Sequence, residues 1–222
     1  MTALIDLYWS FRSPYCYLLG VQLRRALEGH DAVIMLRPVY PAAVRNTEFF
    51  ERVDPLWFPY FARDVKRAAE MLGVPIRWPV PDPVAVEPGS QKPLPDQPLI
   101  RRLTQLGVAA QEAGAGLNFV EAVGDVLWRG EIDGWHEGDH LSRAVQAAGL
   151  DLVDLDAVTA REENRIDAVI AQNELDQRKA GHWGVPLMVL DGEPFFGQDR
   201  LPALLWRLEQ RARASGSAAS VS

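Results

Sequence analysis

Near the N-terminus, the run Ser13-Pro14-Tyr15-Cys16 carries the side chains best suited to sulfur chemistry. Thiol–disulfide exchange needs two thiols at such a turn, as Cys-x-x-Cys, and the first must be acidic enough to attack. Here a hydroxyl stands first, and a hydroxyl cannot form a mixed disulfide. Cys16 is the only cysteine of the chain, which also excludes an intramolecular disulfide and a cysteine-rich metal site. Sulfur chemistry would therefore need an external thiol, and we expect Cys16 to be a small packed residue.

Two further runs with polar or conformationally special residues lie near the C-terminus. Trp183-Gly184-Val185-Pro186 directly precedes a predicted hairpin, and Phe196-Gly197-Gln198-Asp199-Arg200 opens the last predicted helix. Ser13-Pro14 also begins a helix, because serine is a good N-cap and proline suits the first helical position. All three runs therefore stand at the ends of predicted elements.

A fourth run, His136-Glu137-Gly138-Asp139-His140, matches the H-E-x-x-H pattern of zinc-binding helices. Zinc chemistry needs both histidines on one helix face, but Gly138 and Asp139 are unfavourable inside a helix. No third ligand is indicated elsewhere in the sequence. We expect a polar turn that caps the next helix, and no metal site.

Apolar periodicity and turn residues predict the elements that must position these runs. The segment 75–98 is rich in proline, which disfavours helix, and is predicted to be an extended loop. From the N-terminus, the sequence predicts a strand at 3–9, a helix at 13–27, a strand at 31–38, a helical segment at 48–72 broken near Pro55 and Pro59, helices at 99–113, 117–129, 140–148 and 154–180, strands at 185–190 and 193–196, and a helix at 199–213.

The order of these elements predicts an α/β fold. Strand–helix–strand at the start, with strand–strand–helix at the end, is the thioredoxin arrangement, and everything between is helical. We therefore expect a thioredoxin-like fold whose two halves, 1–46 and 181–213, are separated by a large all-helical insertion at 47–180. The last residues, 214–222, are mainly Ala, Ser and Gly, and we expect a disordered tail.

Composition and charge exclude several functional classes. The chain has 222 residues, of which 48% are hydrophobic and 24% charged, as in ordinary globular proteins. Its net charge is −7, and it lacks the basic stripe of a nucleic-acid-binding protein. No apolar run approaches the roughly 18 residues of a membrane span, and no secretory signal is visible. We expect a cytoplasmic protein with neither nucleic acid nor membrane as a partner.

Taken together, the serine, Val-Pro and Gln-Asp-Arg runs resemble the DsbA-like thioredoxin superfamily. Within it, the chain is similar to the 2-hydroxychromene-2-carboxylate isomerases, which are relatives of the kappa-class glutathione transferases. The resemblance extends over residues 4–213 and includes Arg37-Pro38-Val39 after the second predicted strand. It implies glutathione as the cofactor that supplies the missing thiol.

The resemblance also implies roles for particular residues. Ser13 would contact the glutathione sulfur and be the catalytic residue, and Val185-Pro186 would form a cis peptide whose backbone pairs with the tripeptide. Free backbone N–H groups at the start of the last predicted helix would bind the carboxylate of the γ-glutamyl group, and Asp199 would bind its ammonium. The residues expected to bind glutathione are Ser13, Asn173, Trp183, Val185, Pro186, Gln198 and Asp199.

The implied reaction is nucleophilic catalysis with a borrowed thiolate. A free thiol titrates near ~8.5, so a serine O–H donor and the positive end of a helix would favour the thiolate. It would add to a conjugated carbon of an aromatic keto acid, allow rotation, and leave by elimination. The substrate's carboxylate needs a cation, and Arg45, Arg52 and Arg63 are candidates by position, with Arg45 preferred.

Two other functions remain open from the sequence. A kappa-like glutathione transferase would use the same thiolate but release a stable thioether. A non-catalytic thioredoxin-fold protein would instead bind extended peptides beside Pro186, because a missing first cysteine is also what an inactive oxidoreductase would have. Members of the resembled family are often dimers, so a homodimer is compatible with either enzyme.

Overall fold

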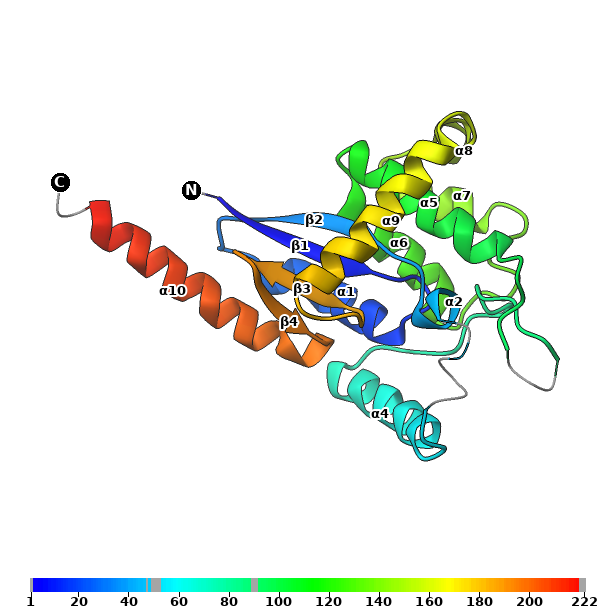
Figure 1. Cartoon of the computed structure of the whole chain (residues 1–222), viewed down its shortest axis with the longest axis horizontal. Coiled ribbons are helices and arrows are strands. Elements are labelled where there is room, and N and C mark those ends of the chain that lie inside the picture. Colours follow the sequence, from blue (N-terminus) through cyan, green and yellow to red (C-terminus); the bar gives the residue numbers. More distant parts are fainter. Residues whose placement is uncertain (1, 47, 49–52, 89–91, 220–222) are drawn as a thin grey trace.

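A mixed four-stranded sheet, in the order β2-β1-β3-β4, lies at the centre of the computed structural model (Figure 1). The structure describes residues 2–46, 48, 53–88 and 92–219. Strand β1 is parallel to β2 and antiparallel to β3, which pairs with β4 in a hairpin. This pairing confirms the predicted thioredoxin-like core. The strands are β1 (Ala3–Trp9), β2 (Ala32–Pro38), β3 (Leu187–Leu190) and β4 (Glu193–Phe196).

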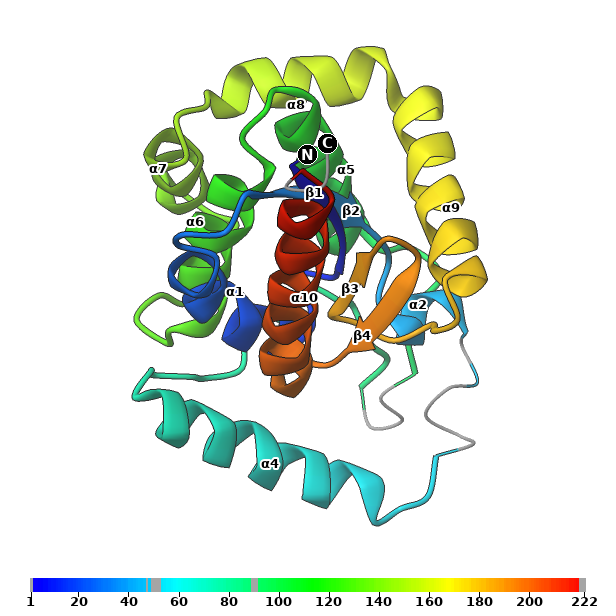
Figure 2. The ribbon, with the colours of Figure 1, turned by 90° about the vertical axis from the view of Figure 1, so that its left-hand side faces the viewer.

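The helices of the thioredoxin-like core pack on one face of this sheet. Helix α1 (Pro14–Ala26) crosses from β1 to β2, and α10 (Leu201–Ala219) follows the short 3₁₀ helix η1 (Gln198–Arg200). Figure 2 shows α1 and α10 side by side in front of the strands. The buried side chains of β1 and α1 belong to the main apolar core, so burial of apolar surface holds the start of α1 against the sheet.

All other helices of the described chain lie between β2 and β3. The first of them falls within the predicted first half, 1–46, and the rest fall within the predicted insertion at 47–180. None of the helices in the described part of the chain is long and apolar enough to cross a membrane. The helices between β2 and β3 are α2 (Ala42–Arg45), α4 (Trp57–Leu72), α5 (Pro98–Glu112), α6 (Gly116–Trp128), α7 (His140–Ala147), α8 (Leu152–Arg161) and α9 (Glu163–Lys179).

The prediction of one helix over 154–180 is wrong. The structure has two helices, α8 and α9, which diverge at Glu162, where φ is −117° and ψ is 25° (Figure 2). Neither Gly nor Pro marks the break, so local propensity does not reveal it. Both helices pack on α5, and this tertiary packing sets the bend.

Helix α4 begins later than the predicted segment at 48–72. It starts at Trp57 and carries Pro59 in its first turn. Proline is tolerated there, because backbone N–H groups in the first turn have no hydrogen-bond partner within the helix. Residues 47 and 49–52 lie outside the described part of the chain. The loop predicted at 75–98 contains no helix before α5 begins at Pro98, apart from 89–91, which the structure does not describe.

The C-terminal helix is longer than expected. Helix α10 extends to Ala219, past the predicted end at 213, so the structure differs from the disordered tail expected at 214–219. Alanine is the strongest helix former, and adding residues to an existing helix is far easier than nucleating one. Residues 220–222 lie outside the described part.

Candidate active site

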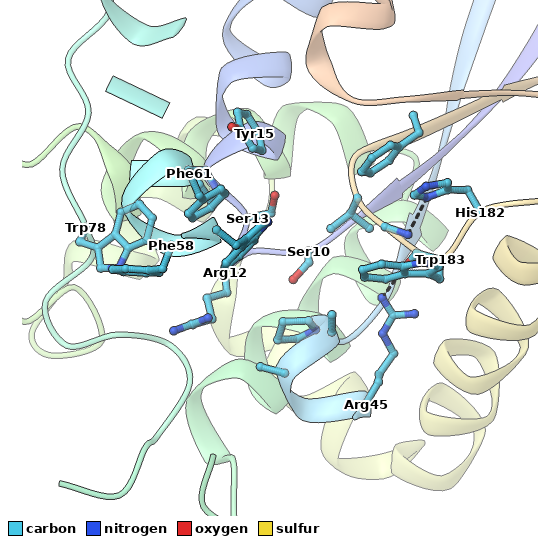
Figure 3. Close-up of a pocket in the computed structure, with 18 residues that line it drawn as sticks. Ser10, Arg12, Ser13, Tyr15, Arg45, Phe58, Phe61, Trp78, His182 and Trp183 are labelled. Atoms are coloured by element: carbon cyan, nitrogen blue, oxygen red, sulfur yellow. Dashed lines mark hydrogen bonds between the residues drawn. The ribbon is translucent and has the colours of Figure 1, made fainter. Parts of the chain in front are cut away.

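A cavity of ≈ 450 Å³ lies where the start of α1 meets α2, α4 and the loop before β3 (Figure 3). Four of the predicted site residues line it, namely Ser13, Arg45, Trp183 and Val185. They come from elements far apart in the sequence, and the sheet brings them together because β1 lies beside β3. Most other lining residues are aromatic or apolar.

Ser13 caps α1 and lies at the cavity wall. Its Oγ accepts a hydrogen bond from the Cys16 backbone N–H at 3.3 Å, and Pro14 occupies the first helical position as predicted. Because the oxygen acts as the acceptor, the hydroxyl proton stays available to a ligand. The positive end of the helix adds to this donor, so an anionic atom would be stabilised here.

Cys16 is buried below Ser13 and does not line the cavity. Its side chain is 0% exposed, and its Sγ accepts from the Ser10 backbone N–H at 3.5 Å. Burial raises the pKa of this thiol to about 12. The expectation of a packed, structural cysteine is confirmed, and Cys16 has the opposite properties to a reactive thiolate.

We predict that Cys16 will not react with an aromatic disulfide reagent at pH 8 in the folded protein. The buried thiol is protonated at that pH and has no access to the reagent. In denaturant, one thiol per chain should react. Rapid labelling under native conditions would contradict this assignment of Cys16.

The segment before β3 has the geometry expected of a peptide-binding edge. The Val185-Pro186 bond is cis, as the resemblance implies. The Pro186 carbonyl accepts from the Gly197 N–H at 2.9 Å, which fixes this segment to the start of η1. Within the described part of the chain, the backbone N–H and C=O of Val185 take no hydrogen bond. They are therefore available to pair with the backbone of a ligand.

His182 is a cavity residue that sequence reasoning missed. Its Nδ1 accepts from the Gly184 N–H at 2.8 Å, and its ring stacks on Phe196 with 3.8 Å between centroids. Burial lowers the pKa of His182, which favours the neutral ring. Because Nδ1 accepts a hydrogen bond, the proton of that neutral ring is on Nε2. In the sequence, only its position next to Trp183 could have indicated that His182 lines the cavity. Its stacking on Phe196 depends on the fold.

The wall opposite this loop is aromatic. Phe61 of α4 stacks on Trp57 at 4.8 Å between centroids and meets the edges of Tyr15 and Trp78 at 5.5 and 6.0 Å. Phe58 completes this wall (Figure 3). These residues were not predicted from the sequence, although aromatic residues on one face of an amphipathic helix could have indicated them.

Arg12 and Arg45 are the two arginines of the cavity lining in the described part of the chain. Arg12 forms a bidentate ion pair with Asp82, with N–O distances of 2.8 Å, and so ties the proline-rich segment to the turn before Ser13. Arg45 donates to the Trp183 carbonyl at 2.9 Å. Both guanidinium groups therefore have protein partners.

Of the other predicted cations, Arg63 does not line the cavity. Arg63, on α4, donates to the Pro59 carbonyl at 3.3 Å. Arg52 lies outside the described residues.

Gln198 and Asp199 lie beside the cavity, in η1, and not in its lining. Gln198 accepts from the Gln22 side chain at 3.2 Å, and Asp199 is exposed and 3.4 Å from Arg200. They follow Gly197, whose φ of 102° favours glycine and where an added Cβ would lie 2.5 Å from Asp199 Oδ1. A ligand reaching η1 must extend from the cavity past Pro186.

The expectation that Asn173 faces the site is wrong. Asn173 is 5% exposed, and its Nδ2 donates to the Pro38 carbonyl at 3.0 Å. It does not line the cavity. The bend at Glu162 sets the direction of α9, and this helix then turns Asn173 toward the end of β2.

The H-E-x-x-H run does not form a helix face. His136 to Asp139 lie in a turn, and α7 begins at His140. The described residues contain no group of three or more His, Cys, Asp or Glu side chains placed to hold a metal ion. The run is a turn that leads into α7, as expected, with Asp139 at the N-cap position. The expected cap is not formed, because the Asp139 side chain makes no capping hydrogen bond within this described stretch.

The arrangement suits a ligand with three chemically distinct parts. The Ser13 hydroxyl at the start of α1 suits an anionic atom, and the unpaired backbone of Val185 suits an extended peptide. The aromatic walls suit a flat apolar group. These three features converge on one cavity.

Comparison with known proteins agrees with this fold. The sequence profile described as a DSBA-like thioredoxin domain matches residues 4–209. No curated protein sequence matches the chain.

Among solved structures, a 2-hydroxychromene-2-carboxylate isomerase has a TM-score of 0.68 and 19% identity, covering 97% of this chain and 98% of that one. A probable DsbA oxidoreductase from Streptomyces coelicolor has a TM-score of 0.64 and 17% identity, covering 94% and 89%. The cytosolic disulfide reductase DsbM from Pseudomonas aeruginosa has a TM-score of 0.58 and 16% identity, covering 95% and 99%. At these identities the likeness concerns the fold.

Proposed function

Because this chain belongs to the DSBA-like thioredoxin domain family, we propose that it is a glutathione-dependent isomerase of aromatic 2-oxo or hemiketal carboxylates. The proposal rests on one observation, which is that Ser13 lies at the cavity while Cys16, the only thiol of the chain, is buried. The position of the attacking thiol holds a hydroxyl at the cavity, and the chain's own thiol is out of reach. The chain therefore has a thioredoxin-like site without dithiol chemistry, and an external thiol would restore a nucleophile to it.

Glutathione fits the features beside this hydroxyl. Its cysteinyl sulfur would lie at Ser13, and its backbone would pair with Val185, next to the cis bond to Pro186. The γ-glutamyl end would reach η1, where Gln198 and Asp199 lie. Asp199 supplies a carboxylate for the ammonium, and the start of the last helical segment offers N–H groups for the γ-glutamyl carboxylate.

The proposed reaction returns the glutathione unchanged. Bound glutathione would supply a thiolate that adds reversibly to a conjugated carbon of the acceptor. The former double bond would then be single and free to rotate, and elimination would restore both the double bond and the thiolate. The Ser13 O–H stabilises the thiolate before addition and after elimination.

The cavity supports an aromatic acceptor. Its volume of ≈ 450 Å³ is within the range of pockets for small organic ligands. Phe61 and Trp57 offer a stacked surface on one side, and Trp183 lies on the other (Figure 3). A flat ring between these walls would place its conjugated chain toward Ser13.

A kappa-like glutathione transferase is the second candidate. Both arginines that line the described cavity are paired with carboxylates, Arg12 with Asp82 and Arg45 with Glu174. Such pairing lowers their attraction for a substrate carboxylate and favours an uncharged electrophile. This enzyme would use the same thiolate but release a thioether.

Two measurements test the proposal. Ultraviolet absorbance of the thiolate against pH should give bound glutathione a thiol pKa below the ordinary value of ~8.5. Incubation with glutathione and 2-hydroxychromene-2-carboxylate should then yield an isomer with no loss of glutathione. A stable thioether would favour the transferase. Absence of glutathione binding would overturn both enzymes and favour a peptide-binding protein.

We predict that Asp199→Asn will weaken glutathione binding about two- to fivefold, because an exposed ion pair contributes little. Glutaryl-cysteinyl-glycine, which lacks the α-ammonium, is the matched ligand and should bind both proteins equally. Isothermal calorimetry measures both affinities. An equal loss for the two ligands would show that Asp199 acts through the local structure of η1.

A further inference from the structure

We propose that Arg45, Glu174 and Gln177 form a buried clamp that positions residues 183–185 for the ligand, and that Arg45 is a positioning residue and not the cation for the acceptor's carboxylate. The identity of the ligand rests on the proposed function. Arg45 ends α2, within the first thioredoxin-like half, whereas Glu174 and Gln177 lie on α9, within the helical insertion. The clamp therefore assigns to the helical insertion a role in glutathione binding.

Arg45 makes the first link of the clamp. Its side chain is only 8% exposed although it lines the cavity. Nη2 donates to the Trp183 carbonyl at 2.9 Å, and Nη1 donates to Gln177 Oε1 at 3.1 Å. Figure 3 shows the guanidinium of Arg45 directed toward the Trp183 segment. Both terminal nitrogens thus donate within the protein, while Nε has no hydrogen-bond partner among the described residues.

Glu174 compensates the buried charge of Arg45. Its Oε1 lies 4.0 Å from Arg45 Nε, which is an ion-pair distance without a hydrogen bond. The same oxygen accepts from the Tyr40 backbone N–H at 3.1 Å, so the carboxylate is itself held in place. A buried charge is tolerated when it is paired and hydrogen-bonded, and Glu174 meets this need from α9.

Gln177 makes the second link. Its side chain is 0% exposed, and its Nε2 donates to the Gly184 carbonyl at 2.8 Å. The Gly184 N–H donates to His182 Nδ1. Side chains thus hold two consecutive carbonyls, those of Trp183 and Gly184, directly before Val185.

The clamp leaves open the atoms that a ligand needs. Residues 183 and 184 are held by side chains, and Pro186 by the Gly197 N–H. Only Val185 between them keeps a backbone N–H and C=O without partners in the described structure. Preorganised binding groups lower the entropy lost on binding, so the clamp should raise affinity for an extended tripeptide.

The main test compares Arg45→Met and Gln177→Leu with wild type. Either variant should raise the glutathione Kd about tenfold, because each removes the side-chain donor that holds one of the two carbonyls before Val185. The thiolate pKa of bound glutathione should not change, because Ser13 is intact. Arg101→Met is the matched control, since Arg101 is a half-exposed arginine of α5 with its own ion pairs. An unchanged Kd in both variants would overturn the clamp.

A second readout separates positioning from direct binding of a carboxylate. With a keto-acid acceptor and its methyl ester, Arg45→Met should lower kcat/KM by the same factor for both. A loss confined to the charged acceptor would overturn the proposal and assign Arg45 to that carboxylate.

Hydrogen exchange keeps the clamp testable without glutathione. In the ligand-free protein, peptides covering residues 182–188 should exchange faster in Arg45→Met and Gln177→Leu than in wild type or Arg101→Met. Gln177→Leu removes no charge, so it serves if Arg45→Met fails to fold. If wild type binds no glutathione yet exchange rises as expected, the proposed function fails and the clamp stands. Unchanged exchange in both variants overturns the clamp.

Discussion

Replacing Ser13 by alanine is expected to raise the thiol pKa of bound glutathione by about 1 to 2 units and to lower turnover about 10- to 100-fold. The physical reason is the lost O–H donor, since a hydrogen bond to a charged group contributes about 1.5–3 kcal/mol and one pKa unit corresponds to about 1.4 kcal/mol. Thiolate is the reactive form, so activity is lost as pH falls below the thiol pKa. The pH–rate profile of the variant should therefore move to higher pH.

The control for Ser13→Ala must account for the helix cap. Ser13 also accepts from the Cys16 N–H, and loss of an N-cap destabilises a protein by about 1 kcal/mol. Asp151 caps α8 in the same way, far from the cavity, by accepting from the Val153 N–H at 2.7 Å. Asp151→Ala should lower stability without changing the thiol pKa. If both variants move the pKa alike, or neither does, Ser13 has no special role toward sulfur.

Replacing Phe61 by alanine is expected to lower kcat/KM for an aromatic acceptor about 10- to 100-fold. Phe61 contacts the rings of Trp57, Tyr15 and Trp78, so its removal opens the wall that would hold the acceptor. Burying a side chain of this size contributes about 1.5–3 kcal/mol. Steady-state kinetics with varied acceptor at saturating glutathione measure the effect.

Tyr60 offers a matched control on the same helix. It neighbours Phe61 but is 56% exposed and does not line the cavity, so Tyr60→Ala should leave kcat/KM nearly unchanged. Glutathione affinity should stay the same in both variants, because neither residue lies beside Val185 or η1. A parallel loss of glutathione binding in Phe61→Ala would mean that α4 supports the whole site and not the acceptor alone.

The two predictions test different halves of the proposed reaction. Ser13→Ala concerns the sulfur, which isomerase and transferase would share, and Phe61→Ala concerns the acceptor. Effects in both would support an enzyme that brings glutathione and an aromatic compound together. An effect of Ser13 alone would keep glutathione chemistry and place the acceptor elsewhere.

Local signals in the sequence are sufficient to predict the thioredoxin-like core and the chemistry that the chain lacks. Strands β1 to β4 and helix α1 follow from local apolar patterns, an N-cap serine and a tight turn, and such signals act over a few residues. Serine at position 13 excludes dithiol exchange whatever the fold, because this depends on residue type alone. The buried state of Cys16 and the cis bond at Val185-Pro186 agree with the same interpretation.

Which side chains meet in the cavity depends on tertiary packing and could not be predicted from local sequence. The bend at Glu162 has no local signal, yet it directs Asn173 away from the site and brings Gln177 to the Gly184 carbonyl. The aromatic face of α4 and the ring of His182 likewise reach the cavity through packing between segments distant in the chain. Sequence periodicity predicts which face of a helix is apolar. It does not predict which other segment packs against that face, because this depends on contacts between residues far apart in the chain.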